Sequence, residues 1–195
     1  QLFLEKEAML PTLQSEPLIL RPFVQEDLPN ILVLVQDKDV AATTLTIPYP
    51  CTEEAINYWF RLQQQELEEG KVLRWAVCLT GTNELIGTMK LATHPEYESA
   101  ELGYWIGKPY WGNGYASEAG YLVVDYAFRT LELNRVEAHA MVENIVSAKV
   151  LRKLGMREEG YHPQLIKKWG EFKDVKTYGL LREQWVASQT KSTAS

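Results

Sequence analysis

Cysteine and histidine are scarce in this sequence, and no apolar run is long enough to cross a bilayer. The cysteines number two, Cys51 and Cys78, and they have neither metal-site nor redox-pair spacing. The histidines are scattered, with His94 beside a proline and His139 on an expected strand, and they assemble neither a metal site nor a Ser-His-Asp triad. We therefore expect a protein of the reducing cytoplasm that needs no metal and does not enter the membrane.

Positive charge is also in deficit, with 20 Lys and Arg against 26 Asp and Glu and a formal net charge of −6. A surface that binds nucleic acid carries clustered excess Lys and Arg, so direct nucleic-acid binding is not expected. An acidic chain instead suits a cationic amine as substrate. Segment 1–7 lacks the form of a signal peptide.

The chain has the size and composition of one globular domain. Its 195 residues are 46% apolar and 11% aromatic, which is enough for a full core. No repeat, linker or composition break divides it. We expect an N-terminal extension over 1–16, a domain over 17–186, and a disordered tail over 187–195, where the residues are small and polar.

The most informative stretch is 101–119, where a strand leads through a glycine loop into a helix. Alternating apolar residues predict the strand: Leu102, Tyr104 and Ile106. After Pro109, small residues follow at every second position: Gly112, Gly114 and Ala116. Apolar residues at helical spacing begin after Ser117. Unsatisfied N–H groups and the positive end of the helix dipole then meet at an open loop, a place that receives a phosphate.

The spacing within this loop excludes two common phosphate sites. A P-loop needs Lys followed by Ser or Thr after its last glycine, but Tyr115 and Ala116 follow Gly114. A dinucleotide fingerprint needs a third glycine and an acidic residue after a second strand, and neither is present. The remaining structural alternative is a strand-turn-helix whose glycines serve only the turn.

The rest of the chain predicts a mixed α/β (α+β) sheet in which an antiparallel meander leads into the glycine loop. Strands are expected over 17–23, 73–79, 84–91, 101–106, 135–140, 156–161 and 174–181. Helices are expected over 26–35, 53–69, 117–130 and 147–154, with Thr52 and Asn144 as N-caps and Gly70 and Gly155 as stops. Segments 43–50 and 164–172 are expected to include loops.

Two motifs in this order resemble the GNAT acetyltransferases. Trp111, Gly114 and Ala116 stand at the positions of that family's pyrophosphate loop, Gln or Arg, two residues, Gly, one residue, Gly or Ala. Segment 144–156, in which an Asn opens a helix ending in Lys-Leu-Gly-Met, resembles the family's next motif. The words around the loop are most similar to the branch of the ribosomal-protein N-terminal (alanine/serine) acetyltransferases. Over 18–181, the resemblance implies a twisted, mostly antiparallel sheet flanked by helices, with strands splayed at an acetyl-CoA site.

Acetyl-CoA is the co-substrate that this resemblance implies. The loop N–H groups would hold its phosphates, the splayed strand would pair with its pantetheine arm, and an N–H near Ile106 would face the oxyanion. Trp111 replaces the Gln or Arg of the pattern, which removes one guanidinium and leaves the backbone contacts. The expected cofactor-binding residues are Tyr104, Trp105, Ile106, Trp111, Gly112, Asn113, Gly114, Tyr115, Ala116, Ser117, Asn144 and Ser147.

Three residues carry the expected chemistry, and each has a structural alternative. By resemblance, Ser147 protonates the leaving thiolate, although a Ser is common in any first helical turn. Glu101 is the candidate base, acting through water, unless it is simply a solvent-exposed carboxylate. Asp174 would orient the acceptor amine, or else cap a turn. No Tyr stands where many relatives place a tyrosine acid, which favours Ser147 as the acid.

The sequence thus predicts an N-acetyltransferase that moves acetyl from acetyl-CoA to a primary amine by direct attack. The expected acceptor is a protein N-terminal α-amine. The alternatives are a small amine, such as an amino acid, a polyamine or an aminoglycoside, and a non-catalytic CoA-binding sensor. Acceptor choice is expected to lie in 43–50 and 164–172, and the protein is expected to be a monomer or a homodimer.

Overall fold

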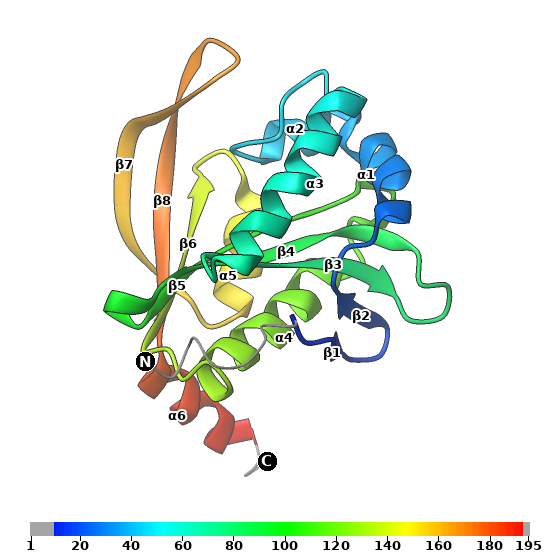
Figure 1. Cartoon of the computed structure of the whole chain (residues 1–195). Helices are drawn as coiled ribbons and strands as arrows, with labels where there is room; N and C mark the ends of the chain where they lie inside the picture. Colours follow the sequence, from blue (N-terminus) through cyan, green and yellow to red (C-terminus); the bar gives the residue numbers. More distant parts are fainter. Residues whose placement is uncertain (1–9, 193–195) are drawn as a thin grey trace.

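A single eight-stranded sheet organises the molecule, in the order β1-β2-β3-β4-β5-β6-β8-β7 (Figure 1). The computed structural model describes residues 10–192. The strands are β1 (Leu13–Gln14), β2 (Leu18–Arg21), β3 (Val72–Leu79), β4 (Leu85–His94), β5 (Ser99–Ile106), β6 (Arg135–Met141), β7 (Arg157–Lys168) and β8 (Glu171–Leu181). The helices are α1 (Leu28–Val35), α2 (Lys38–Thr43), α3 (Glu53–Glu68), α4 (Tyr115–Arg129), α5 (Ile145–Lys153) and α6 (Arg182–Ser192), with short 3₁₀ turns at Gln25–Asp27, Pro95–Tyr97 and Lys108–Tyr110.

The sheet is antiparallel except between β5 and β6, which confirms the predicted mixed fold class. The parallel pairing covers only Ser99–Glu101 against Arg135–Glu137. Beyond Glu101 the two strands share no register, so they separate. Helix α4 crosses between them, as a parallel connection requires. The sheet is therefore open along one seam in its middle.

Helices cover both faces of the sheet and give the molecule two cores. Leu102 and Ile106 of β5 point to the face that carries α4 and α5, where they join the larger core with Phe128 and Leu151. Trp105 points to the opposite face and packs on the smaller core under α1 and α3. The predicted alternation of β5 thus decides which side chains lie on each side of the seam.

The start of α3 follows the expected capping chemistry. The Thr52 side chain accepts a 3.1 Å hydrogen bond from the Ala55 N–H, and Glu53 and Glu54 lie in the first turn. We expect Thr52→Ala to lower the free energy of unfolding by about 1 kcal/mol, because the Ala55 N–H loses its acceptor. Urea unfolding would measure this, with Thr52→Ser as the control that keeps the hydroxyl. Equal stability of the two variants would contradict the cap.

Two regions differ from the sequence prediction. Helix α2, which was not predicted, is capped by Asp37, whose side chain accepts from the Asp39 N–H at 2.8 Å. Strands β7 and β8 are longer than expected and meet at a tight turn, so 164–172 is largely a hairpin and not a loop. Trp169 and Gly170 have φ of 51° and 86°, the positive values that a two-residue hairpin turn requires. The two strands and their connection were predicted, but a tryptophan gives no tight-turn signal in sequence, which is why the length of the hairpin was underestimated.

Both ends of the described chain belong to the fold. Leu10 is buried and β1 pairs with β2, so part of the predicted extension is in the sheet, while 1–9 lie outside the described residues. The prediction of a disordered tail is wrong for 187–192, which are helical within α6. The buried ring of Trp185 anchors α6, with its centroid 5.5 Å from that of Phe128. Residues 193–195 are outside the description. No helix within 10–192 has the length and apolarity to cross a membrane.

Candidate active site

The glycine loop between β5 and α4 leaves its backbone donors open. Gly112 and Gly114 both have φ of 80°, and Gly114 is the N-cap of α4. Within 10–192, no acceptor bonds the backbone N–H groups of 112–117, which include Tyr115, Ala116 and the buried Ser117. These open donors and the positive end of the α4 dipole suit an anion such as a phosphate.

The larger side chains of the loop are turned back onto its own backbone. The Trp111 indole Nε1 donates to the Ile106 carbonyl at 2.6 Å, and the Asn113 amide Nδ2 donates to the Tyr110 carbonyl at 3.1 Å. Trp111 therefore fastens the loop to the end of β5. At this position the family pattern has Gln or Arg, whereas here the uncharged Trp111 forms a hydrogen bond that holds the loop in place.

The open edge of β5 faces the seam between β5 and β6. The Gly107 N–H donates to the Ile86 carbonyl at 2.7 Å, so this residue faces β4. Because backbone groups alternate between the two neighbours of a strand, the N–H groups of Tyr104 and Ile106 point away from β4. That direction is the seam, where β6 no longer pairs. An extended ligand could bond this edge as an added strand does.

Tyr104 and Ser147 meet on the α5 side of the seam. Asn144 caps α5 by accepting from the Ser147 N–H at 3.0 Å, which confirms its predicted capping role. The Ser147 Oγ lies 2.9 Å from the Tyr104 hydroxyl. Burial raises the pKa of Tyr104 to about 12, so the phenol stays protonated at neutral pH. The sequence named Tyr104 as a cofactor-binding residue but did not predict its contact with Ser147, which lies 43 residues further along the chain.

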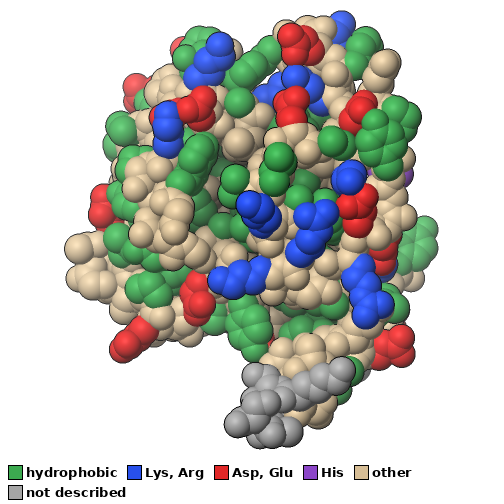
Figure 2. All heavy atoms as spheres, turned by 180° about the vertical axis from the view of Figure 1, so that it is seen from behind, with side chains coloured by type: hydrophobic (Ala, Val, Ile, Leu, Met, Phe, Trp, Pro, Cys, Tyr) green, Lys and Arg blue, Asp and Glu red, His purple; other side chains and the backbone are tan. Residues whose placement is uncertain are grey.

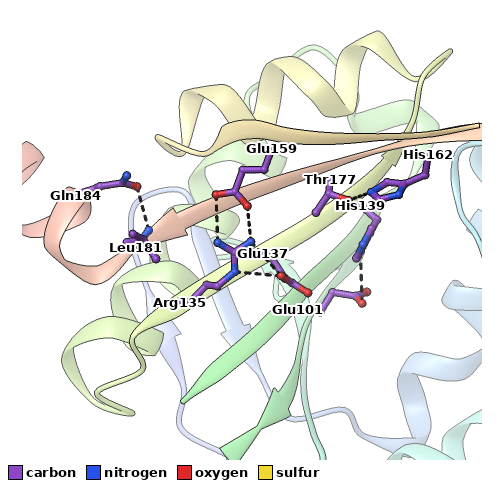
Figure 3. A network of polar contacts seen from close by, with 9 residues as sticks. All are labelled: Glu101, Arg135, Glu137, His139, Glu159, His162, Thr177, Leu181 and Gln184. Carbon is purple, nitrogen blue, oxygen red and sulfur yellow. Dashed lines mark hydrogen bonds and ion pairs between the residues drawn. The ribbon is translucent and has the colours of Figure 1, made fainter. Parts of the chain in front are cut away.

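Glu101 lies on the opposite side of the seam and has two cationic neighbours. Its carboxylate is 3.6 Å from the His139 Nδ1 (Figure 3). It is also 3.8 Å from the Lys90 Nζ. The contact with His139 lowers the pKa of Glu101, and Lys90 adds to this effect. About a third of the Glu101 side chain is exposed, at 32%. The sequence predicted Glu101 but did not connect His139 to it.

Asp174 is held within the β7–β8 hairpin. Its carboxylate accepts from the Gln164 N–H at 2.8 Å and from the Tyr161 hydroxyl. The hydrogen bond from Tyr161 lowers the pKa of Asp174. The carboxylate therefore has the turn-binding contacts that the structural alternative described, and its role toward an acceptor stays a prediction.

The two segments expected to choose the acceptor lie against each other. The ring centroids of Tyr49 and Trp169 are 5.7 Å apart, and the buried Lys168 ammonium donates to the Thr44 carbonyl. The Asn144 amide reaches the Thr43 carbonyl at 3.4 Å from the other direction. The tip of the β7–β8 hairpin and the segment 43–50 therefore pack against each other.

Cations collect on the face of the molecule that carries α4 and α5. Figure 2 shows Lys and Arg side chains gathered in the middle of the face opposite to the one that carries α3 in Figure 1. The exposed cations of α5 are Lys149, Arg152 and Lys153. Lys153 and Ser117 line a cavity of about 140 Å³ between α4 and α5. A positive surface beside an anion-binding loop suits a polyanionic ligand, despite the negative net charge.

Residues 17–157 match the family model described as an acetyltransferase (GNAT) domain. The chain therefore belongs to the GNAT acetyltransferases. The open seam between parallel strands β5 and β6, beside the glycine loop and the N-terminus of α4, is the arrangement that the resemblance to this family implied. The chain is accordingly an acetyltransferase, which confirms the predicted family and class of enzyme.

Two relatives with known sequences show which acetyltransferases this chain is similar to. The chain is 32% identical to the uncharacterized N-acetyltransferase p20 of Bacillus licheniformis, over 90% of this chain and 99% of the relative. It is 29% identical to the [ribosomal protein uS5]-alanine N-acetyltransferase of Escherichia coli, over 52% of this chain and 54% of that protein. This match supports the predicted resemblance of the glycine-loop sequence to the ribosomal-protein N-terminal acetyltransferases.

Solved structures share the fold along nearly the whole chain. A GNAT-family acetyltransferase from Bacillus anthracis has a TM-score of 0.78 and 29% identity, covering 89% of this chain and 99% of the other. A spermidine N-acetyltransferase from Vibrio cholerae, solved with CoA and spermine, has a TM-score of 0.77 and 24% identity, covering 88% and 99%. The second likeness concerns the fold alone.

Proposed function

We propose that this protein transfers acetyl from acetyl-CoA to the N-terminal α-amine of a protein. One observation supports the cofactor assignment. The unbonded backbone N–H groups of 112–117 directly follow the edge of β5 that is not paired with β6. Phosphates fit the loop and the cations of α5, and the pantetheine arm fits the strand edge. The solved relative from Vibrio cholerae contains CoA, which supports a CoA thioester as the donor.

The residues around the seam fit direct attack by an amine. The amine nitrogen bonds the acetyl carbon, and the N–H of Ile106 is the proposed donor to the oxygen as it becomes negative. The carbon–sulfur bond then breaks, the Ser147 hydroxyl gives its proton to the sulfur, and the nitrogen releases its extra proton to solvent water, which leaves the neutral amide. Tyr104, at 2.9 Å, orients that hydroxyl and can replace the proton. Cofactor-side and acceptor-side groups thus act from opposite faces of the seam.

An α-amine is the acceptor best suited to neutral pH. Its pKa is about 7.7–8.0, against about 10.4 for lysine, so a large fraction is already the nucleophilic free amine. The ribosomal-protein alanine acetyltransferase of Escherichia coli, by its name, acts on such a group, and this chain is 29% identical to it over 104 residues. Both observations favour an N-terminal Ala or Ser.

A polyamine is the second candidate acceptor. The solved spermidine N-acetyltransferase shares the fold and holds spermine. The net charge of −6 also suits a polycation. Identity of 24% does not carry a substrate across, so the argument for the polyamine rests on charge.

Thiol release from acetyl-CoA tests the acceptor directly. We expect peptides beginning with Ala or Ser to give a kcat/KM at least about tenfold above that of spermidine, which corresponds to about 1.4 kcal/mol of transition-state binding. The same peptides with a blocked N-terminus and one internal Lys are the matched control. Faster release with spermidine would replace the protein acceptor by the polyamine, and no release with any amine would refute the proposed reaction.

A further inference from the structure

The acceptor side of the seam holds a carboxylate–imidazole pair that no sequence motif indicated. Glu101 is the last residue of β5 that pairs with β6, and its partner in register is Glu137. His139 follows on the same face of β6, two positions further along, where the strands have separated. Figure 3 shows the Glu101 and His139 side chains pointing toward one another from β5 and β6. The pair therefore lies at the point where the seam opens.

The orientation of the imidazole is that of a base held by a carboxylate. The His139 Nδ1 faces the Glu101 Oε2 at 3.6 Å, an ion-pair distance. Within 10–192 the other ring nitrogen, Nε2, has no polar partner, and about a quarter of the side chain is exposed, at 26%. With the Nδ1 proton directed at the carboxylate, Nε2 is left with its lone pair. The carboxylate of Glu101 is therefore placed to favour a proton on Nδ1, which leaves Nε2 as the accepting atom.

We propose that His139 is the general base of the reaction and that Glu101 is its positioning residue. This inference rests on the proposed acetyl transfer and moves the role of base from Glu101 to its neighbour. The acceptor ammonium gives one proton to the His139 Nε2, directly or through one water, and its nitrogen lone pair attacks the acetyl carbon. The imidazolium is then stabilised by the Glu101 carboxylate until the proton passes to solvent.

The charges around His139 decide the pH at which it works. Glu101 of β5 and Glu137 of β6 raise the pKa of His139 above its ordinary value of 6.5, and Lys90 of β4 opposes them. Glu137 is itself bound by Arg135 at 3.1 Å, and on β8 the uncharged Thr177 is the register partner of His139. Because only neutral imidazole accepts a proton, activity should rise with pH through the raised pKa of His139. The carboxylate of Glu101, whose pKa is lowered, stays ionised throughout.

Two variants separate the roles of the pair. In pH profiles of kcat/KM with an Ala-N-terminal peptide, His139→Gln should lose the limb that rises with pH and about 30-fold to 100-fold of the rate. Glu101→Gln should keep the limb but move it to lower pH, because the carboxylate that raises the pKa of His139 is gone. A limb that belongs to the acceptor amine moves when spermidine replaces the peptide, whereas the limb of His139 does not. Added imidazole should restore part of the rate of His139→Ala.

His162→Gln is the matched control. His162 lies on the neighbouring strand β7, where its Nε2 contacts the Thr177 Oγ1 at 2.8 Å without touching Glu101 (Figure 3). This variant should retain the wild-type profile. If His139→Gln keeps the limb while Glu101→Gln abolishes it, Glu101 is the base and the proposal is overturned. Absence of release by the wild-type enzyme with every amine would instead refute the acetyl transfer itself.

Discussion

Gly114→Val should reduce the affinity for CoA and acetyl-CoA about 1,000-fold. Gly114 has φ of 80°, and a Cβ built there meets nothing within 4 Å, so the new side chain would point into open space. In the proposed complex the phosphates occupy that space. Losing two hydrogen bonds from backbone N–H groups to a charged phosphate, each worth about 1.5–3 kcal/mol, accounts for the expected loss. Calorimetric titration with both ligands measures it.

The control for this substitution is Gly70→Val. Gly70 also has a positive φ, 66°, and its added Cβ also meets nothing within 4 Å. Both variants place a β-branched residue in the left-handed region, at about 1–2 kcal/mol of backbone strain, so both should unfold more easily. Only Gly114→Val should lose CoA affinity. Normal binding by Gly114→Val would remove the phosphates from the glycine loop.

Ser147→Ala should lower kcat about 100-fold while the Kd for CoA changes by less than about twofold. The hydroxyl acts only in the step in which the sulfur takes its proton, so its loss should slow turnover without weakening CoA binding. An effect of this size is typical of a general acid. The capping bond runs from the Ser147 N–H to the Asn144 side chain and survives the change, so α5 should keep its start, while the Tyr104 hydroxyl loses its 2.9 Å partner at a cost of about 1 kcal/mol. Single-turnover acetyl transfer and calorimetry together give the two quantities. An unchanged kcat would leave Ser147 without a role as acid.

Tyr104→Phe tests whether the two hydroxyls act as one unit. Alone it should lower kcat less than Ser147→Ala, because the serine keeps its own O–H. In the Ser147→Ala background it should have no further effect, since the 2.9 Å contact through which it acts is already gone. Additive losses would show that the phenol acts independently of Ser147.

Local chemistry made much of the fold predictable. The caps at Thr52 and Asn144 form the hydrogen bonds that their residue types suggest, and the glycine loop opens α4 as its spacing indicates. The features that were not predicted have no signal in the local sequence. Helix α2 is too short for a clear apolar period, and the long β7–β8 hairpin turns at Trp169, a residue with no preference for positive φ.

The sequence by itself determined most of the central strands and helices, the glycine loop that opens α4 and the family, because each depends on neighbours within a few residues. The tertiary structure alone decided which distant side chains meet across the seam. The register that places Glu101 beside Glu137 brings His139 to Glu101, and the packing of α5 brings Ser147 to Tyr104. Parallel strands joined through a helix have no turn that fixes their register, so the pairing is set by how α4 and α5 pack on the sheet. The local sequence therefore defines the loop where we propose that the cofactor binds, whereas the pairs to which we assign proton transfer come together only in the folded sheet.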